Sequence, residues 1–268
     1  MSSTALNTSA TGLSALTTQL EVIANNLANV DTDAFKASRA NFADLLYMQK
    51  QQPGVENVAG QYNPTGISVG LGTRVSGIQA NFQQGSPRTT GMPFDLCIQG
   101  DGFFQIETND DIGGGIAYTR LGTFIPNNEG QLVLANGQGL PLIPDIVIPQ
   151  DAIGVTVTLD GVVTATFQTG QQTQLGTLVL ARFVNPSGLL PVGNNLYIET
   201  QASGDPILNE PLEDGTGSVL QGALESSNVD PVTQLVQLIQ TQRAFEMNSQ
   251  VIQAANSNWQ TINSLWRY

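Results

Sequence analysis

Histidine is absent from the 268-residue chain, and cysteine occurs once, as Cys97. Histidine is the most frequent general base near neutral pH and a frequent metal ligand. A Cys–His dyad or a zinc cluster would need both residue types. A single cysteine cannot form an intrachain disulfide, and the alternating sequence FDLCIQGDGFFQI around it favours a buried structural thiol. We therefore expect no metal, no cofactor and no enzymatic activity.

Charged residues are scarce, at 12% of the chain, which is about half the usual share in globular proteins. The net charge is nevertheless −13. Residues 1–50 contain three basic and four acidic residues, and residues 222–268 contain two basic and three acidic, so the middle carries −11. An acidic middle argues against a nucleic-acid partner, because phosphates would repel it. The nearly neutral ends can pack against copies of themselves without charge repulsion.

Long apolar runs are also missing, since none reaches the ~18 residues that a membrane helix needs. We therefore predict no membrane insertion. The first twenty residues carry no charged side chain, whereas a Sec-type signal peptide begins with basic residues followed by an apolar block. The sequence predicts a cytoplasmic protein unless another export system handles it.

Apolar residues recur with a heptad pattern near the N-terminus. Their spacing predicts a helix over residues 5–30 with one apolar seam, and the short polar residues 31–33 should end it. The seam residues are Leu6, Leu13, Leu16, Leu20, Ile23, Leu27 and Val30.

A second heptad pattern occupies the C-terminal end, where Asp230 is the expected N-cap and Pro231 the first helical residue. Neither amphipathic helix has a core of its own, so we expect the two to pair as a coiled coil. The second seam consists of Leu238, Phe245, Asn248, Ile252, Ala255, Trp259, Ile262 and Trp266.

Amides flank both seams. They suit either an ordinary intrachain coiled coil or a helix packed on several sides in a multi-chain assembly, and periodicity alone leaves both open. These residues are Asn25, Asn26, Asn29, Gln234, Gln237, Gln240 and Gln242.

Residues 82–222 contain short apolar, β-branched runs separated by turn sequences such as PNNEG and ANGQG. This pattern predicts an antiparallel sandwich or barrel. Residues 48–75 hold two prolines and five glycines, which exclude a continuous helix and favour an extended arm or hairpin. The fold class is therefore α+β. We expect a helical domain from residues 1–33 and 226–268, an arm at 34–81, and a β-rich domain at 82–225.

Two loop motifs could suggest ligand sites. Asp110 and Asp111 in ETNDDIGGG lack the ligand spacing of a calcium-binding EF-hand loop, so an acidic hairpin tip is the better interpretation. The sequence GDG at 100–102 does not open a helix, so it predicts a tight turn before the strand FFQIE rather than a phosphate site.

Four sequence blocks, in order, resemble the axial proteins of the bacterial flagellum, which include rod, hook and hook-associated proteins. They are LEVIANNLANVDTDAFKASRANFADLL, LCIQGDGFFQIE with AYTRLGTF, NPSGLLPVGNNLYIETQASGDP, and LQGALESSNVDPVTQLVQLIQTQRAFEMNSQVI. The residues that match the family signatures are Asn25, Asn26, Asn29, Phe35, Lys36, Gly102, Phe103, Phe104, Ser227, Asn228, Val229, Gln242, Arg243 and Phe245.

Within this family, residues 48–75 resemble the extra stretch that marks the distal rod group, and the chain has no room for the outer domain of hook proteins. A proximal rod subunit or a hook-type axial protein is the alternative. The chain departs from the family pattern at Ala34, where glycine is usual. If that turn needs a positive φ, alanine would be strained there. Gln234 and Gln250 replace charged residues, which puts any salt bridge at those positions in doubt.

The resemblance implies a subunit that is exported through the flagellar type III apparatus without a cleavable signal. It would polymerise helically into the rigid drive shaft of the basal body, which spans the periplasm and surrounds the export channel. Its partners would be copies of itself, other rod subunits, the hook protein, the ring proteins and the export apparatus. Two rivals are a phage-tail or surface-fibre subunit, and a secreted carbohydrate-active enzyme with an acid pair in a cleft.

Overall fold

In a computed structural model, which describes residues 2–54, 65–109 and 113–265, the chain forms two compact units. Unit 1 contains Met1–Ala28, Ser38–Ala80 and Asp230–Tyr268, and unit 2 contains Asn29–Ala37 and Asn81–Val229. The division differs from the expected one because Ser38–Ala80 belongs with the helices instead of forming a separate arm. Strands of this segment pack directly on the first helix, which explains the grouping.

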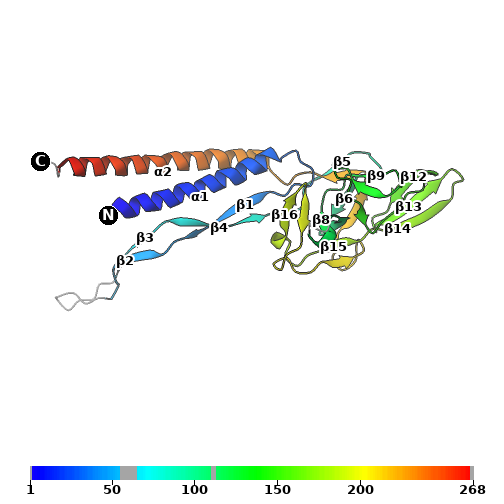
Figure 1. Cartoon of the computed structure of the whole chain (residues 1–268), viewed down its shortest axis with the longest axis horizontal. Helices are drawn as coiled ribbons and strands as arrows, with labels where there is room; N and C mark the ends of the chain where they lie inside the picture. Colours follow the sequence, from blue (N-terminus) through cyan, green and yellow to red (C-terminus); the bar gives the residue numbers. More distant parts are fainter. Residues whose placement is uncertain (1, 55–64, 110–112, 266–268) are drawn as a thin grey trace. The chain divides into compact units, whose positions relative to one another are not determined.

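Two long helices, α1 (Ser2–Ala28) and α2 (Pro231–Leu265), lie side by side in unit 1 (Figure 1). Asp230 caps α2 as predicted. Its carboxylate accepts hydrogen bonds from the Thr233 hydroxyl at 2.5 Å and from the Val232 amide at 3.1 Å. These two bonds lower the pKa of Asp230. The bond from the Val232 amide satisfies a backbone donor that the first helical turn leaves without a backbone partner.

The first helix ends two residues earlier than the sequence predicted. Its last residue is Ala28, and a turn follows in which Thr32 bonds to both the carbonyl and the side chain of Asn29. Short polar side chains compete with helical backbone bonds in this way. The prediction that Val30 belongs to the helical seam is therefore wrong, because Val30 lies in this turn.

Unit 1 also contains two antiparallel strand pairs. They are β1 (Ser38–Asp44) with β4 (Thr73–Ala80), and β2 (Tyr47–Gln51) with β3 (Ile67–Gly70). The described part of the 48–75 segment is thus a paired arm, while the prediction for residues 55–64 lies outside the described residues. Gly72 lets the arm approach α1. Its φ is +123°, and a Cβ there would lie 2.1 Å from the Thr11 hydroxyl oxygen.

Unit 2 is built from antiparallel pairs, which confirms the α+β class. Its largest sheet has seven strands, with the order β16–β17–β8–β7–β15–β18 and β11 attached to β7. These strands are β7 (Phe103–Glu107), β8 (Ile116–Thr119), β11 (Leu142–Ile143), β15 (Leu180–Arg182), β16 (Leu190–Gly193), β17 (Leu196–Ile198) and β18 (Ile207–Asn209).

Smaller sheets complete unit 2. A three-stranded sheet contains β12 (Ala152–Val157), β13 (Val162–Phe167) and β14 (Gln172–Thr177). Three further pairs join β6 (Leu96–Gln99) to β19 (Ser218–Gln221), β5 (Pro87–Thr89) to β20 (Ala223–Glu225), and β9 (Phe124–Pro126) to β10 (Leu132–Leu134). Two short 3-10 turns are η1 (Gly113–Gly115) and η2 (Pro186–Gly188).

The core of unit 2 forms on both faces of β7. Phe104 packs into a large aliphatic cluster, and Phe103 packs edge-on against Phe82, Phe183 and Tyr197. Alternation along the strand sends successive side chains to opposite faces. The turn before β7 has φ of 111° at Gly100 and 148° at Gly102, which confirms the predicted tight turn.

Cys97 lies on β6 and is fully buried, which confirms the predicted structural thiol. Burial raises its pKa to about 11, with a further contribution from the nearby Glu225 carboxylate. The thiol is therefore protonated and unreactive at neutral pH. The predicted acidic tip at Asp110 and Asp111 lies outside the described residues.

Candidate functional site

The predicted seam residues of α1 lie at very different depths. Ile23 is 3% exposed, whereas Leu13, Leu16, Leu20 and Leu27 are only half-buried. The other deeply buried positions on this helix are small or polar, namely Ser9, Ala15, Val22 and Asn26. The reason is that α1 is covered by α2 on one side and by β1 and β4 on another, so small side chains occupy the closest approaches.

On α2, the predicted seam residues Leu238, Phe245 and Ile252 are half-buried, and Trp259 is 39% exposed. The side chain of Ile262 and the whole of Trp266 lie outside the described residues. Asn248 occupies a seam position where the helices approach closely. A Cβ on Gly12 would lie 2.8 Å from the side-chain amide nitrogen of Asn248. The same nitrogen donates a hydrogen bond to the Ser9 carbonyl at 2.9 Å.

One of the amides that flank the seams, Asn26, is buried in unit 1. Asn26 is 2% exposed and holds three elements of unit 1 together. Its side chain exchanges two hydrogen bonds with the Ser38 backbone, at 2.8 and 2.9 Å, and donates to the Gln234 side chain at 3.3 Å. Asn26 and Gln234 therefore serve contacts within one chain. The exposed amides Asn25, Gln237, Gln240 and Gln242 leave the alternative of contacts between chains open.

A second apolar surface on α2 is exposed in the single chain. We call it the α2 stripe, and it consists of Val232, Leu235, Val236 and Ile239, which are 45–68% exposed. The spacing of three and four residues places them on one side of the helix. The sequence analysis missed this stripe because it assigned only one apolar seam to each helix. The same spacing rule could have found it.

The arm carries exposed apolar residues as well. Its β1–β4 strands and the connecting segments expose 43–82% of large side chains. Large apolar side chains exposed in one segment make it a candidate interaction surface. The residues are Phe42, Leu46, Tyr47, Met48, Ile67 and Ile78.

Charge is distributed unequally between the units. Unit 1 contains five basic and five acidic residues, and unit 2 contains four basic and seventeen acidic ones. The whole net charge of −13 therefore belongs to unit 2. Copies of unit 1 can approach one another without net repulsion, whereas copies of unit 2 repel.

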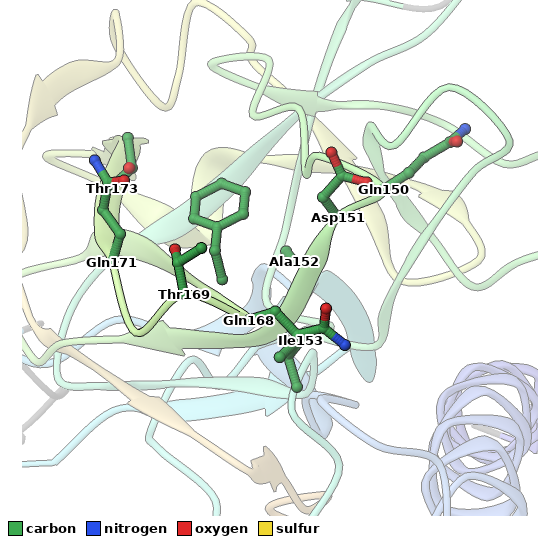
Figure 2. Close-up of a pocket in the computed structure, with 9 residues that line it drawn as sticks. Gln150, Asp151, Ala152, Ile153, Gln168, Thr169, Gln171 and Thr173 are labelled. Carbon is green, nitrogen blue, oxygen red and sulfur yellow. The ribbon is translucent and has the colours of Figure 1, made fainter.

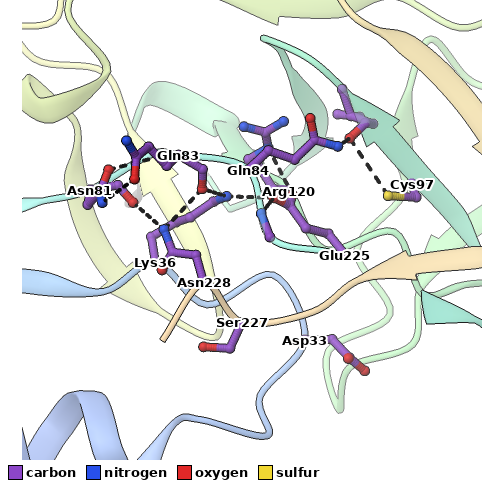
Figure 3. A network of polar contacts seen from close by, with 12 residues as sticks. Asp33, Lys36, Asn81, Gln83, Gln84, Cys97, Arg120, Glu225, Ser227 and Asn228 are labelled. Atoms are coloured by element: carbon purple, nitrogen blue, oxygen red, sulfur yellow. Dashed lines mark hydrogen bonds and ion pairs between the residues drawn. The ribbon is translucent and has the colours of Figure 1, made fainter. Parts of the chain in front are cut away.

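Two signature residues, Lys36 and Asn228, meet Arg120 and Glu225 in a largely buried cluster of unit 2, which we call the polar clasp (Figure 3). The Lys36 ammonium lies 2.6 Å from Glu225 Oε1 and donates to the Gln83 carbonyl at 2.8 Å. Arg120 Nε lies 3.1 Å from Glu225 Oε2, as an ion pair without the alignment of a hydrogen bond. These three charged side chains are 0–3% exposed.

Asn228 links the same cluster to the backbone. It accepts a hydrogen bond from the Ala37 amide at 2.7 Å and donates to the carbonyls of Asn81 and Gln83 at 2.8 and 3.0 Å. Glu225 Oε1 also accepts from the Gly85 amide at 2.8 Å. One amide side chain therefore joins three segments that are far apart in the sequence.

Electrostatics in the clasp follow from burial. Desolvation lowers the pKa of Lys36, and the neighbouring Arg120 guanidinium adds to this effect, while Glu225 opposes it. Arg120 also lies over the Phe103 ring, 5.7 Å from its centroid, and donates to the Gly100 carbonyl. The cluster holds two cations and one carboxylate, so backbone carbonyls and an aromatic face supply the remaining stabilisation.

Sequence reasoning identified Lys36 and Asn228 but missed Glu225 and Arg120. A signal existed for Glu225, because it is the single charged residue in the run GTGSVLQGALESSNV. The remaining signature residues divide by exposure. Val229 is buried and Phe35 is half-buried, whereas Asn25, Gln242 and Arg243 are exposed on the helices. Asn29 lies in the turn after α1, and Ser227 accepts a hydrogen bond from the Val229 amide.

A cavity of about 730 Å³ lies beside the three-stranded sheet of unit 2 (Figure 2). Its lining is mostly amides and hydroxyls, including Gln150, Gln168 and Thr169, and Asp151 is the single carboxylate among the described residues there. Paired-carboxylate hydrolysis would need a second acid in the same cavity.

Within the described residues, no group of three or more potential metal-ligating side chains is close enough to hold an ion. In that same part of the chain, neither helix has a sufficiently long apolar stretch to cross a membrane.

Three family descriptions match separate parts of the chain. Residues 6–36 match the flagella basal body rod protein family, residues 97–165 match the flagellar hook protein FlgE/F/G D1 domain, and residues 220–265 match the flagellar basal body rod FlgEFG protein C-terminal region. The first and last of these cover the clasp residues Lys36, Glu225 and Asn228.

Curated relatives match over nearly the full length. The flagellar basal-body rod protein FlgG of Agrobacterium fabrum is 45% identical over 94% of this chain and 95% of its own. In Caulobacter vibrioides, FlgG is 41% identical over 97% of this chain and 98% of its own, whereas FlgF is 33% identical over 85% and 83%. The chain therefore belongs to the flagellar basal-body rod protein family, within its FlgG group of distal rod proteins.

Proposed function

We infer that the chain is a structural subunit of the flagellar basal-body rod, in its distal segment. The observation that carries this inference is the surface of unit 1, where α2 has one half-buried face toward α1 and a second apolar stripe exposed. A helix that is apolar on two sides needs partners on both. Family membership makes other copies of the chain the natural partners for that second side.

The proposed mechanism is mechanical rather than catalytic. Each subunit would place its α2 stripe and its exposed arm against different surfaces of neighbouring copies. A contact between unlike surfaces extends as a helical filament when the rotation between successive copies does not close a ring, and this non-closing case is the one proposed here. The neutral helices would form the inner wall around the export channel, and the filament would transmit motor torque to the hook.

The acidic unit 2 would form the outer layer of this shaft, where other rod subunits, the hook protein and the ring proteins are the proposed partners. Like charge on neighbouring copies of unit 2 keeps that layer soluble and limits adhesion to the surrounding rings. Replacing several exposed carboxylates of unit 2 by lysine should therefore slow rotation or disturb ring assembly. Unchanged rotation and unchanged rings would argue against this role.

Export through the flagellar type III apparatus, without a cleavable signal, belongs to the same proposal, as does the location in the periplasm-spanning part of the basal body. The distal position is favoured over a proximal one by the greater similarity to FlgG than to FlgF in one organism.

We expect deletion of residues 48–75 to leave a curved, hook-like polymer. A straight polymer after the deletion would remove the stiffening role of the arm.

Polymerisation tests the proposal directly. We expect the purified chain to form salt-dependent filaments by electron microscopy. Ile239→Asp, in the α2 stripe, should abolish them while the near-UV circular dichroism of unit 2 is unchanged. The matched control is Ile207→Asp, since Ile207 is similarly exposed, at 44% against 49%, but lies on unit 2. If the Ile239→Asp chain still formed filaments, the α2 stripe would not be a contact surface between copies.

A further inference from the structure

The chain passes between unit 1 and unit 2 four times, after residues 28, 37, 80 and 229. Three of these passages begin or end in segments that the polar clasp binds. Ala37 and Asn81 are hydrogen-bonded to each other through the backbone at 2.7 Å, and Asn228 bonds to both. The segments of unit 2 that lead into unit 1 are therefore joined to one another by a few hydrogen bonds, which are part-buried or exposed and lie next to the buried Lys36–Glu225 pair.

The composition of the clasp argues for a positional role. Burying two cations and one carboxylate is costly, and apolar side chains of similar volume would usually fill such a space with equal or greater stability. Apolar contacts are not directional, whereas these bonds fix particular backbone atoms. Glu225 alone binds Lys36, the Gly85 amide and, through its own backbone carbonyl, the Ala34 amide at 2.7 Å.

We propose that Lys36, Glu225 and Asn228 are positioning residues. They hold together the three segments of unit 2 that continue into unit 1 after residues 37, 80 and 229, so that a force on one of these connections is shared by the other two. This inference rests on the proposed function, because sharing matters in a shaft that transmits torque. Arg120 acts through Glu225, whose second oxygen it holds.

The polar clasp predicts a local effect on backbone dynamics. In Asn228→Ala, which leaves no buried charge unpaired, we expect amide hydrogen exchange at Ala37 to accelerate at least tenfold, since its acceptor is removed. In Glu225→Gln, exchange at Gly85 should accelerate by roughly a hundredfold, because its carboxylate acceptor is replaced by a neutral amide. Amides of β7 and β8 should keep their rates in Asn228→Ala, which separates local opening from global unfolding.

Two controls make the result specific. Arg88→Ala removes an exposed ion pair with Asp33, at 2.8 Å, on a neighbouring segment of unit 2 and should leave the exchange at Ala37 unchanged. Val163→Ala, a fully buried core position outside the clasp, should accelerate exchange across unit 2 without favouring the clasp amides.

The functional test uses the full chain in assembled flagella. Cells with Asn228→Ala should swim in dilute medium and lose rotation as viscosity rises, whereas cells with Arg88→Ala should match the wild type. Unchanged exchange at Ala37, equal exchange changes in β7 and β8, or equal loss of rotation in Arg88→Ala would each overturn the proposal. Exchange is measured on the free chain, so a failure of the wild type to polymerise would refute the proposed function and not this inference.

Discussion

Units 1 and 2 belong to one chain but differ in how many hydrophobic side chains each of them buries. Among the described residues, unit 1 buries only three hydrophobic side chains, Ala15, Val22 and Ile23, and all the other buried ones lie in unit 2. Unit 2 has two hydrophobic clusters of its own and carries all the net charge. The difference indicates that unit 2 is folded by its own core, and it supports the proposal that unit 1 is completed by surface from other copies of the chain.

The largest expected loss of stability comes from the charged buried network of unit 2, compared with the neutral buried hydrogen bonds of unit 1. Glu225→Gln in unit 2 leaves Lys36 and Arg120 facing each other without a counter-charge, and should cost about 3–5 kcal/mol of stability. Asn26→Ala in unit 1 loses neutral hydrogen bonds and should cost about 1–3 kcal/mol. Urea unfolding followed by circular dichroism measures both, and an equal cost would contradict the distinction.

Leucine truncations test whether the two units differ in their cores. Leu180→Ala, fully buried in unit 2, should cost about 2–5 kcal/mol in the free chain. Leu20→Ala, half-buried in unit 1, should cost about 1 kcal/mol in the free chain and should weaken filaments far more. A loss at Leu20 as large in the monomer as at Leu180 would mean that unit 1 has a complete core by itself.

Alkaline pH should affect unit 2 selectively. Burial is the main cause that raises the pKa of Cys97 to about 11 and those of Tyr118 and Tyr197 to about 12. The unfolded chain loses these protons first, so stability is intact below pH 9 and falls as pH rises toward 12. Each group should contribute on the order of 1 kcal/mol. Lys36, with a lowered pKa, acts in the opposite direction but is a single group.

Urea titrations of the full chain at pH 8, 9.5 and 11 check this expectation. In Cys97→Ala, the onset of the loss should move from about pH 9 toward pH 10, because the tyrosines then titrate first. A unit 2 transition that does not depend on pH over this range would show that these groups are solvated in the folded state.

The smallest effect concerns a strained turn in unit 2. Ala34 has a φ of 59° and is 1% exposed, so the turn does have the positive φ that the sequence analysis raised as a condition for strain. Ala34→Gly relieves about 1 kcal/mol of strain but removes a buried methyl group worth about 0.8 kcal/mol. The net change in stability should stay below about 1 kcal/mol by thermal unfolding. A gain above 2 kcal/mol would show that the methyl group is not well packed.

The sequence predicted what depends on local pattern and missed what depends on distant partners. Heptad spacing located both helices, Asp230 and Pro231 located the start of α2, and the turn sequences indicated the β-rich unit. Glu225 and Arg120 were missed because Glu225 lies 189 positions from Lys36, and Arg120 is also far in the sequence from Glu225, its own partner. No local rule connects these residues. Heptad spacing also carried no information on how deeply each α1 seam residue is buried, since that depends on β1 and β4 covering a second side of the helix.

Methionine oxidation tests the central claim most directly, because the chain carries its own control. Met48 and Met247 lie on unit 1 and Met92 lies on unit 2, with exposures of 44%, 61% and 62%. In the free chain all three should react with peroxide at similar rates. In filaments, we expect oxidation of Met48 and Met247 to slow at least tenfold while Met92 keeps its rate. Equal reactivity of all three in filaments, or protection of Met92 alone, would contradict assembly through unit 1.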